Sequence, residues 1–329
     1  MTENLFHRFT TTSSLLVLAI GISLLASARL ATAGNLFVSN GDSSPAGAIY
    51  QFTPNGRQST FASGLNEPVG LAFSSSGDLF EADFSSGNIY EFTPNGARST
   101  FASGLNEPTW LAFNSSGNLF VSARGSGNIY EFTPNGTQST FASGLDIPAG
   151  LAFNSSGDLI ASDAGSGNIY EFTPNGTQST FASGLDGPRG LALNSSGDLF
   201  EADTGSGHIF EFTPSGTRST FASGLAGPLG LAFNSGGDLF EADGGSGHIF
   251  EFTPSGKRST FALAGAVGLA FAPTAEPALT GASVSPVPEP STVTLIAVGA
   301  VCARTLAWRR RRRCEPFHGR LRAIAFLPF

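Results

Sequence analysis

The sequence predicts an all-β fold built from six copies of one four-stranded unit, and three observations carry this prediction. The 42 Gly and 19 Pro among 329 residues disfavour helices, because both residues destabilise a helix interior. The 30 Phe beside a single Met favour strands, since aromatic side chains suit a pleated, half-buried surface. A phrase recurs every 40 residues, and its constant aromatic residues are Phe52, Phe92, Phe132, Phe172, Phe212 and Phe252.

One repeat unit contains four short strand patterns, at residues 70–73, 78–83, 88–92 and 99–102. Turns rich in Ser and Gly separate them, and residues 93–96 combine Pro, which fixes φ, with Gly, which accepts a left-handed backbone. The unit therefore predicts an antiparallel meander. A repeat of about 40 residues with this pattern is typical of one blade of a β-propeller.

The two ends of the repeat region complement each other. The second-strand phrase occurs first, at residues 35–40, and the first-strand phrase occurs last, at residues 269–271. Joining them completes a sixth blade, so residues 34–273 predict a six-bladed propeller whose ring is closed by the C-terminal strand and the N-terminal strands. An open array or a β-solenoid is the alternative, but neither needs complementary partial repeats.

The N-terminal segment predicts a signal peptide over residues 1–33. Arg8 precedes an apolar run at residues 15–26, and small residues follow, with cleavage expected after Ala33. An N-terminal membrane anchor is the alternative, but the apolar run is shorter than the roughly 20 residues that span a bilayer.

The C-terminal segment begins with a Pro-, Ala-, Ser- and Thr-rich stretch at residues 274–286, which predicts a linker. The features that follow are Pro288, Glu289 and Pro290, an apolar segment at residues 293–308, and five arginines at residues 309–313. This order over residues 287–313 resembles the PEP-CTERM sorting signal of bacterial surface proteins. The sequence assigns no role to the tail at residues 314–329.

The resemblance to the sorting signal implies three things. An exosortase is the expected processing partner, and residues 293–308 are expected to hold the chain transiently in the inner membrane. The exported protein is then expected at the cell surface or in the extracellular matrix, with exopolysaccharide or surface proteins as partners.

Charge and cysteine content narrow the function further. Between Gly34 and Pro286, 7 basic residues stand against 22 acidic ones, a formal charge of −15. Nucleic-acid binding is not expected, because phosphate contacts need clustered Lys and Arg. Cys302 and Cys314 lie beyond the repeats, so neither a disulfide nor Cys-bound zinc holds the fold together.

The recurring phrases Pro-x-Gly-Leu-Ala-Phe, Ser-Ser-Gly-Asp-Leu-Phe and Gly-Asn-Ile-Tyr, over residues 35–271, resemble NHL repeats. They are also similar to the gluconolactonase and virginiamycin B lyase propellers. The first resemblance implies binding of proteins or nucleic acid, and the second implies lactonase or lyase activity with a metal ion.

One face of the ring is expected to collect acidic residues, because the second turn and the crossing to the next blade lie at the same end of a meander. The predicted ligand-binding face comprises Glu67, Asp83, Asp146, Asp163 and Asp243, and the predicted site for Ca²⁺ or another divalent cation comprises Glu107, Asp186 and Asp203. Glu107 before Pro108 resembles a metal ligand of the gluconolactonase family. The alternative is that the turn aspartates cap their own backbone.

Two further sets of residues are candidates for chemistry. Glu81, Glu201 and Glu241 are expected to face a neighbouring blade, either as acids with raised pKa values or, as the sequence favours, tolerated near a wet axis. His208 and His248 are expected to make hydrogen bonds within turns.

The repetition argues against catalysis, because near-identical blades do not supply unlike groups in one asymmetric constellation. The sequence assigns no catalytic residue and predicts a noncatalytic binding or scaffold protein of the cell surface or exopolysaccharide matrix. A metal-dependent lactonase or lyase is one alternative, and a structural repeat protein without a specific ligand is the other.

Overall fold

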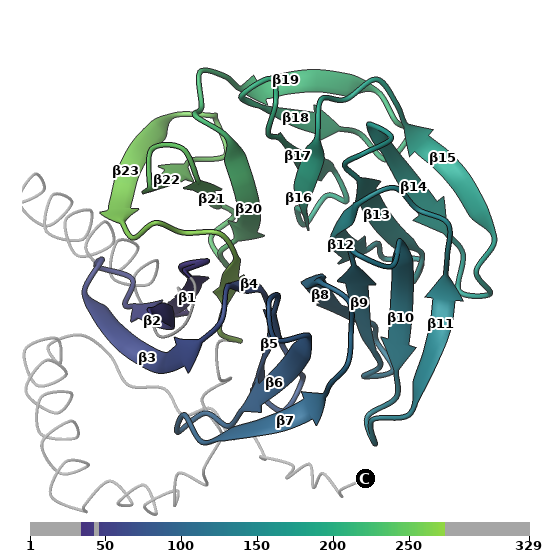
Figure 1. Cartoon of the computed structure of the whole chain (residues 1–329). Coiled ribbons are helices and arrows are strands. Elements are labelled where there is room, and N and C mark those ends of the chain that lie inside the picture. Colours follow the sequence, from purple (N-terminus) through teal and green to yellow (C-terminus); the bar gives the residue numbers. More distant parts are fainter. Residues whose placement is uncertain (1–33, 43–45, 274–329) are drawn as a thin grey trace, which may run out of the picture. The chain divides into compact units, whose positions relative to one another are not determined.

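A computed structural model describes residues 34–42 and 46–273, which form six four-stranded antiparallel sheets arranged in a ring (Figure 1). The predicted all-β, six-bladed propeller is confirmed. The signal peptide with Ala33, the linker, the sorting segment and the tail lie outside the described residues. Within the described part, no helix is long and apolar enough to cross a membrane.

Each blade runs from the middle of the ring to its rim, as the labels of Figure 1 show. The innermost strands are β4 (Pro68–Phe73), β8 (Pro108–Phe113), β12 (Pro148–Phe153), β16 (Pro188–Leu193), β20 (Pro228–Phe233) and β24 (Leu269–Phe271). The second strands are β1 (Leu36–Ser39), β5 (Leu79–Asp83), β9 (Leu119–Ala123), β13 (Leu159–Asp163), β17 (Leu199–Asp203) and β21 (Leu239–Asp243).

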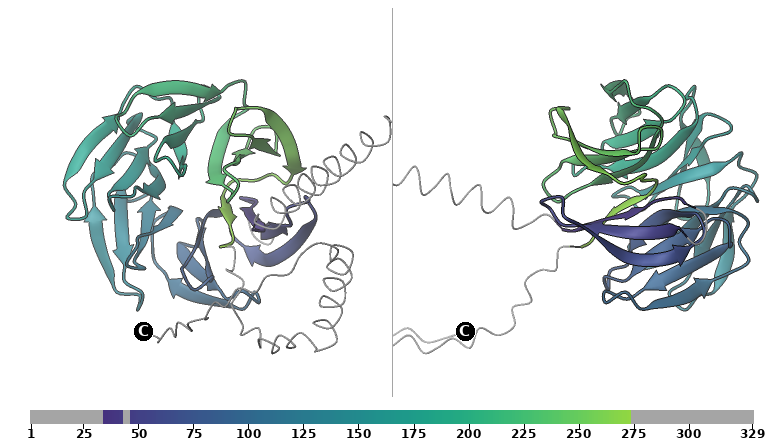
Figure 2. Two further views of the ribbon diagram at one scale, coloured as in Figure 1. Left: turned by 180° about the vertical axis from the view of Figure 1, so that it is seen from behind. Right: turned by 60° about the vertical axis from the view of Figure 1, so that its left-hand side comes forward.

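The outer half of each blade repeats the same pattern. The third strands are β2 (Gly47–Phe52), β6 (Asn88–Phe92), β10 (Asn128–Phe132), β14 (Asn168–Phe172), β18 (His208–Phe212) and β22 (His248–Phe252). The outermost strands are β3 (Gln58–Leu65), β7 (Arg98–Ala102), β11 (Gln138–Ala142), β15 (Gln178–Ala182), β19 (Arg218–Ala222) and β23 (Arg258–Leu263). Figure 2 shows the same ring from behind and turned by 60°.

Blade 1 closes the ring. It has the strand order β24-β1-β2-β3, and blades 2 to 6 follow in chain order from β4. In blade 1, Phe271 pairs with Leu36 and Leu269 pairs with Val38 in antiparallel register. The predicted pairing of the C-terminal strand with the N-terminal strands is therefore confirmed, and every strand of the ring lies within residues 34–273.

Phenylalanine packs the blades against one another. The constant Phe at the end of each third strand is only 1% exposed in all six blades. Phe80 of blade 2 makes edge-to-face contacts with Phe101 of its own blade and with Phe113 of blade 3, each at 5.1 Å between ring centroids. Such pairs add stabilisation beyond the burial of apolar area, so they fix the angle between neighbouring sheets.

The innermost strands approach each other closely, and glycine permits this approach. A Cβ atom on Gly150 of blade 4 would lie 2.1 Å from the carbonyl oxygen of Arg189 in blade 5. Gly70, Gly190, Gly230 and Gly268 meet the next blade in the same way. Blade 3 departs from this pattern, because Trp110 stands at the equivalent position.

Candidate functional site

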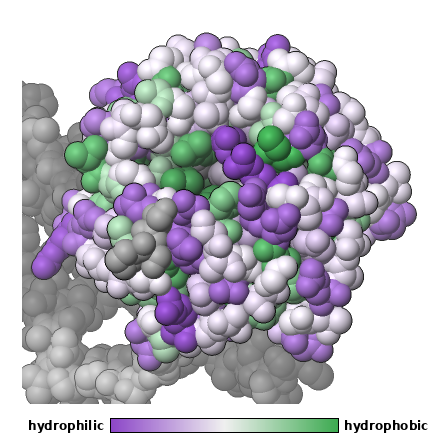
Figure 3. Space-filling view, in the orientation of Figure 1, coloured by the Kyte–Doolittle hydropathy of each residue, from purple (hydrophilic) through white to green (hydrophobic). Residues whose placement is uncertain are grey.

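The two faces of the ring carry different loops. We call the face with the second turns and the blade-to-blade crossings the crossing face, and the opposite face the groove face. On the crossing face, turn and crossing are joined by backbone hydrogen bonds, such as Arg124 N to Glu107 O at 2.9 Å and Ala164 N to Ile147 O at 3.0 Å. Figure 3 shows one face of the ring, where hydrophilic and hydrophobic residues lie side by side around its middle.

The blades differ from one another around the axis of the crossing face. At the start of the innermost strand region, the six blades have Val69, Thr109, Ala149, Arg189, Leu229 and Val267. At the start of the turn after the second strand, they have Phe84, Arg124, Ala164, Thr204, Gly244 and Gly41. We call these twelve residues the axial rim. Its varied side chains stand on a repeated backbone, which makes it a candidate site for recognition.

The side chains of the predicted turn aspartates accept hydrogen bonds from backbone amides of the turn and of the crossing. The carboxylate of Asp203 accepts the amide of Asp186 at 2.9 Å and the amide of Ser206 at 3.2 Å. Asp83, Asp163 and Asp243 accept the equivalent crossing amides at 2.7, 3.1 and 2.7 Å. All four aspartates are buried, so the geometry is that of the capping alternative.

The predicted metal ligands lie in different surroundings. Glu107 is 44% exposed, and its carboxylate lies 3.9 Å from Nε of Arg124. Asp186 is exposed, whereas Asp203 is buried and accepts backbone amides. Of the residues predicted beside them, Asp146 is exposed and Glu67 is half-buried and accepts the Ser85 hydroxyl. Within residues 34–42 and 46–273, no three His, Cys, Asp or Glu side chains converge on a metal position. The metal site therefore stays a prediction that this geometry does not favour.

Three crossing residues hold an unfavourable backbone conformation. Glu67, Glu107 and Ile147 have φ values of 61°, 54° and 65°, in the left-handed region that favours glycine. Blades 5 and 6 have Gly187 and Gly227 at the same position. The side chains in blades 2, 3 and 4 are thus kept at a cost of about 1 kcal/mol or more, as is common at binding sites.

The three glutamates on second strands are drier than expected. Glu81, Glu201 and Glu241 are 0% exposed, and neither carboxyl oxygen of any of them has a hydrogen-bond partner. Burial raises the pKa of Glu201 to about 9, with Asp203 adding to the shift, and burial beside Asp243 raises the pKa of Glu241 to about 9. Burial also raises the pKa of Glu81. The three carboxyls are therefore enclosed between blades and do not open to solvent at the axis, contrary to the expectation, and burial favours their protonated form.

The other three blades fill the same place differently. Where blades 2, 5 and 6 have Glu followed by Ala, blades 1, 3 and 4 have an apolar residue followed by Ser39, Ser122 or Ser162. Ser122 Oγ donates to the carbonyl of Ala149 at 2.7 Å, and Ser162 Oγ donates to that of Arg189 at 2.6 Å, in each case on the next blade. The hydrogen bonds of these serines link neighbouring blades beside the axis.

The two histidines occupy equivalent positions but differ in their contacts. His208 Nδ1 lies 3.0 Å from the hydroxyl of Ser206, which is the expected turn hydrogen bond. His248 Nδ1 has no hydrogen-bond partner, and both rings stack on a following Phe, at 5.5 and 5.6 Å. The side-chain hydrogen bond within the turn is thus present at His208 and missing at His248 Nδ1.

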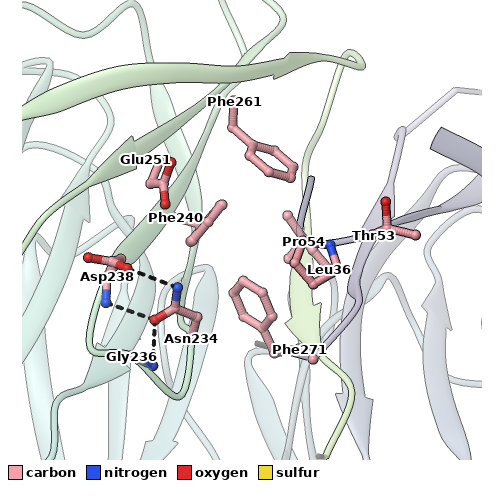
Figure 4. Close-up of a pocket in the computed structure, with 11 residues that line it drawn as sticks. Leu36, Thr53, Pro54, Asn234, Gly236, Asp238, Phe240, Glu251, Phe261 and Phe271 are labelled. Atoms are coloured by element: carbon pink, nitrogen blue, oxygen red, sulfur yellow. Dashed lines mark hydrogen bonds between the residues drawn. The ribbon is translucent and has the colours of Figure 1, made fainter. Parts of the chain in front are cut away.

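The groove face contains a site that the sequence did not indicate. A cavity of about 190 Å³ lies between blades 6 and 1 (Figure 4). Phe240 forms its aromatic wall with Phe261 and Phe271, each at 5.0 Å between ring centroids. Asp238 and Glu251 supply carboxyl groups, and burial beside Asp238 raises the pKa of Glu251.

The turn beside this cavity is rigid. The side chain of Asn234 accepts the amides of Gly236 and Asp238 at 2.8 and 2.9 Å, and its Nδ2 donates to the Asp238 carboxylate at 3.1 Å (Figure 4). An Asx side chain that bonds its own turn in this way fixes the loop. The polar edge of the cavity is therefore held in place before any ligand arrives.

The same groove recurs around the ring. A cavity of about 470 Å³ between blades 2 and 3 is lined by Phe80, Phe101, Phe113 and Glu91. A cavity of about 590 Å³ between blades 5 and 6 is lined by Phe200, Phe221, Phe233 and Glu211. We call the three cavities the interblade grooves.

Comparison with known proteins identifies the C-terminal segment. Residues 286–312 match the PEP-CTERM protein-sorting motif, which confirms the prediction for this segment. The motif indicates export and surface sorting through an exosortase. A comparison with curated proteins found no match.

Solved structures with the same fold include three instructive examples. A chain of a nidogen/laminin complex is 20% identical with a TM-score of 0.66, over 73% of this chain and 98% of that one. Virginiamycin B lyase from Staphylococcus aureus is 16% identical with a TM-score of 0.55, over 74% and 92%. A gluconolactonase-like protein is 18% identical with a TM-score of 0.56, over 63% and 81%. At these identities the likeness shows the fold alone.

Proposed function

We propose that the protein is an exported, surface-sorted, noncatalytic propeller that binds a polysaccharide of the cell surface or matrix in its interblade grooves. The observation that carries the proposal is the recurrence of one groove, with three Phe and one Glu, at three places around the ring. A repeating polymer presents the same unit many times, so several weak sites on one rigid ring add up to tight binding.

The groove chemistry suits a neutral sugar. Aromatic rings contact the apolar faces of a pyranose, while the carboxyl groups of Asp238 and Glu251 accept hydrogen bonds from its hydroxyls. The formal charge of −15 between Gly34 and Pro286 repels a polyanion. We therefore expect a neutral polysaccharide on the groove face.

The binding test removes one groove carboxylate in each of three blades. The triple variant of residues 34–273 with Glu91→Ala, Glu211→Ala and Glu251→Ala is expected to bind the neutral matrix polysaccharide of the producing bacterium at least about tenfold more weakly by calorimetry. The matched control changes Arg98, Arg218 and Arg258 to Gln on the outermost strands of the same three blades, and it is expected to bind normally. Equal binding by the Glu triple variant overturns the proposal.

The sorting step is tested on the mature protein. We expect processing at the Pro-Glu-Pro segment to remove residues 309–313, so the intact mass of the surface-associated chain lacks them. A mature chain that retains these arginines contradicts exosortase processing.

A metal-dependent lactonase or lyase is the rival function, and it rests on the shared fold with virginiamycin B lyase and the gluconolactonase-like protein. It requires Glu107, Asp186 and Asp203 to gather around a cation, an arrangement the described residues do not show. Hydrolysis of lactones by the purified chain that stops with a chelator and with Glu107→Gln overturns the noncatalytic proposal.

A further inference from the structure

One turn of the groove face borders two interblade grooves. Blade 6 lies between the groove of about 590 Å³ toward blade 5, which we call groove 5/6, and the groove of about 190 Å³ toward blade 1, which we call groove 6/1. Asn234 and Gly236, in the turn that joins β20 to β21, line both grooves. This turn is therefore the wall that a ligand crosses when it passes from one groove to the other.

The strands on either side of this turn supply both grooves with the same chemistry. Phe233, just before the turn, faces blade 5, and its ring centroid lies 5.0 Å from that of Phe200. Phe240, just after the turn, faces blade 1 and lies at the same centroid distance from the Phe ring of β24. Glu211 lines groove 5/6, and Glu251 lines groove 6/1. Aromatic rings and a carboxyl group that suit a sugar thus lie on both sides of one wall.

The wall of blade 6 has a glycine that its backbone does not require. At the position of Gly236, blades 2 to 5 have Ser76, Ser116, Ser156 and Ser196. The φ of Gly236 lies outside the left-handed region, unlike that of Gly237 at 84°. Beyond its chain neighbours, the nearest atom to a Cβ on Gly236 would be Oδ1 of Asn234, at 3.2 Å. A serine fits here with a small adjustment, so the missing side chain is open to a functional explanation.

The turns of blades 5 and 6 are otherwise held in the same way. Asn234 Oδ1 accepts the amide of Gly236 at 2.8 Å, and Asn194 Oδ1 accepts the amide of Ser196 at 2.9 Å. Both Gly236 and Ser196 are exposed. Figure 4 shows Gly236 beside Asn234 at the edge of groove 6/1. The absence of a hydroxymethyl group at this exposed position therefore lowers the wall between the two grooves.

We propose that one chain of a neutral polysaccharide passes over Gly236 and occupies groove 5/6 and groove 6/1 at once. This inference rests on the function proposed above and adds the length of the ligand, because the paired grooves select a segment that spans blade 6 over shorter fragments. Both grooves belong to one rigid blade. A segment held in the first groove therefore enters the second without a further loss of translational freedom.

Fragments of graded length test this path. The probes are fragments of the neutral matrix polysaccharide of the producing bacterium, separated by length after partial acid hydrolysis, and calorimetry with the purified protein measures their binding. The wild-type affinity is expected to rise with length and to level off at least about tenfold above that of the shortest fragment that binds. Gly236→Ser is expected to remove this gain, because its hydroxymethyl group stands on the wall. Short fragments are expected to bind this variant within about twofold of the wild type, since each groove stays intact.

The reverse exchange in another blade gives the control. Ser156→Gly changes the same position in blade 4, whose turn lines none of the three interblade grooves, and it is expected to bind every fragment as the wild type does. Melting temperatures establish that each variant is folded. A wild-type affinity that does not depend on length, or undiminished binding of long fragments by Gly236→Ser, overturns the path over Gly236 and leaves the proposed function standing. A wild-type protein that binds no fragment of any length overturns both.

Discussion

On the groove face the blades are close copies, whereas around the axis of the crossing face each blade has its own side chains. The turns after the third strands are Thr-Pro-Asn-Gly or Thr-Pro-Ser-Gly in all six blades. The backbone bonds of the crossing face are just as regular, with amide-to-carbonyl distances of 2.9 Å at Arg124 and 3.0 Å at Ala164. The variety of the axial rim is therefore not required by the backbone, which leaves its side chains available for recognition.

The two regions also differ in what holds them together. The repeated outer half is stabilised by buried Phe. The axial side of the blades contains groups that oppose folding, such as buried carboxyls without a hydrogen-bond partner and Ile147 in the left-handed region of the backbone. The stabilising aromatic packing and the strained or unpartnered groups thus lie in different parts of each blade. Substitutions in the two regions are expected to have effects of different size and sign.

The largest effect is expected in the repeated half. Phe212→Ala is expected to lower the free energy of unfolding by about 3–5 kcal/mol, because the ring is 1% exposed and its removal leaves a cavity beside Phe181. Arg189→Gln on the axial rim is expected to lower it by less than about 1 kcal/mol. Urea unfolding measures both, and a rim variant as unstable as Phe212→Ala contradicts the separation.

The pH dependence of stability tests the buried carboxyls. The raised pKa of about 9 for Glu201 means that the native state holds a proton that the unfolded state releases above about 4.5. Stability is therefore expected to fall as pH rises from 5 to 8. Glu201→Gln removes one such proton and is expected to reduce this fall by up to about 4 kcal/mol, the limit for one proton over three pH units.

The control for this measurement is Glu211→Gln on β18, whose carboxylate lies at a groove rather than in the dry interior. It is expected to leave the pH dependence close to that of the wild type. A Glu201→Gln curve parallel to the wild-type curve between pH 5 and 8 shows instead that the carboxyl is charged in the native state.

Most of the fold was predictable because each blade carries its own local signals. The strand predicted at residues 88–92 is β6 (Asn88–Phe92), and the strand predicted at residues 78–83 starts one residue later, at Leu79. Ring closure followed from the complementary ends and is confirmed by the pairing of Leu36 with Phe271. Periodicity and turn chemistry act over a few residues, so one sequence suffices for them.

The sites were less predictable because they depend on distances between blades. Asp203 has the residue type of a metal ligand. Only the approach of the Asp186 amide, 17 residues earlier in the chain, shows that its carboxylate accepts a backbone hydrogen bond instead. Arg124 and Arg189 are far apart in sequence, and only the order of the blades shows that they lie on blades 3 and 5, on either side of blade 4. Alternation predicted which way Glu201 points, but the packing that excludes water from it is a property of two sheets together.

The smallest expected effect concerns the strained crossing of blade 4. Ile147 has a φ of 65°, which a β-branched residue tolerates poorly, while Gly187 holds the same conformation in blade 5 at 67°. Ile147→Gly is expected to raise the free energy of unfolding by about 0.5–1 kcal/mol, since relief of strain exceeds the added chain entropy of glycine. The reverse change, Gly187→Ile, is expected to lower it by about 1 kcal/mol or more. Urea unfolding of the pair decides the matter: if Ile147→Gly is destabilising, the isoleucine packs usefully at the rim, and the crossing of blade 4 belongs to the stabilising part of the ring.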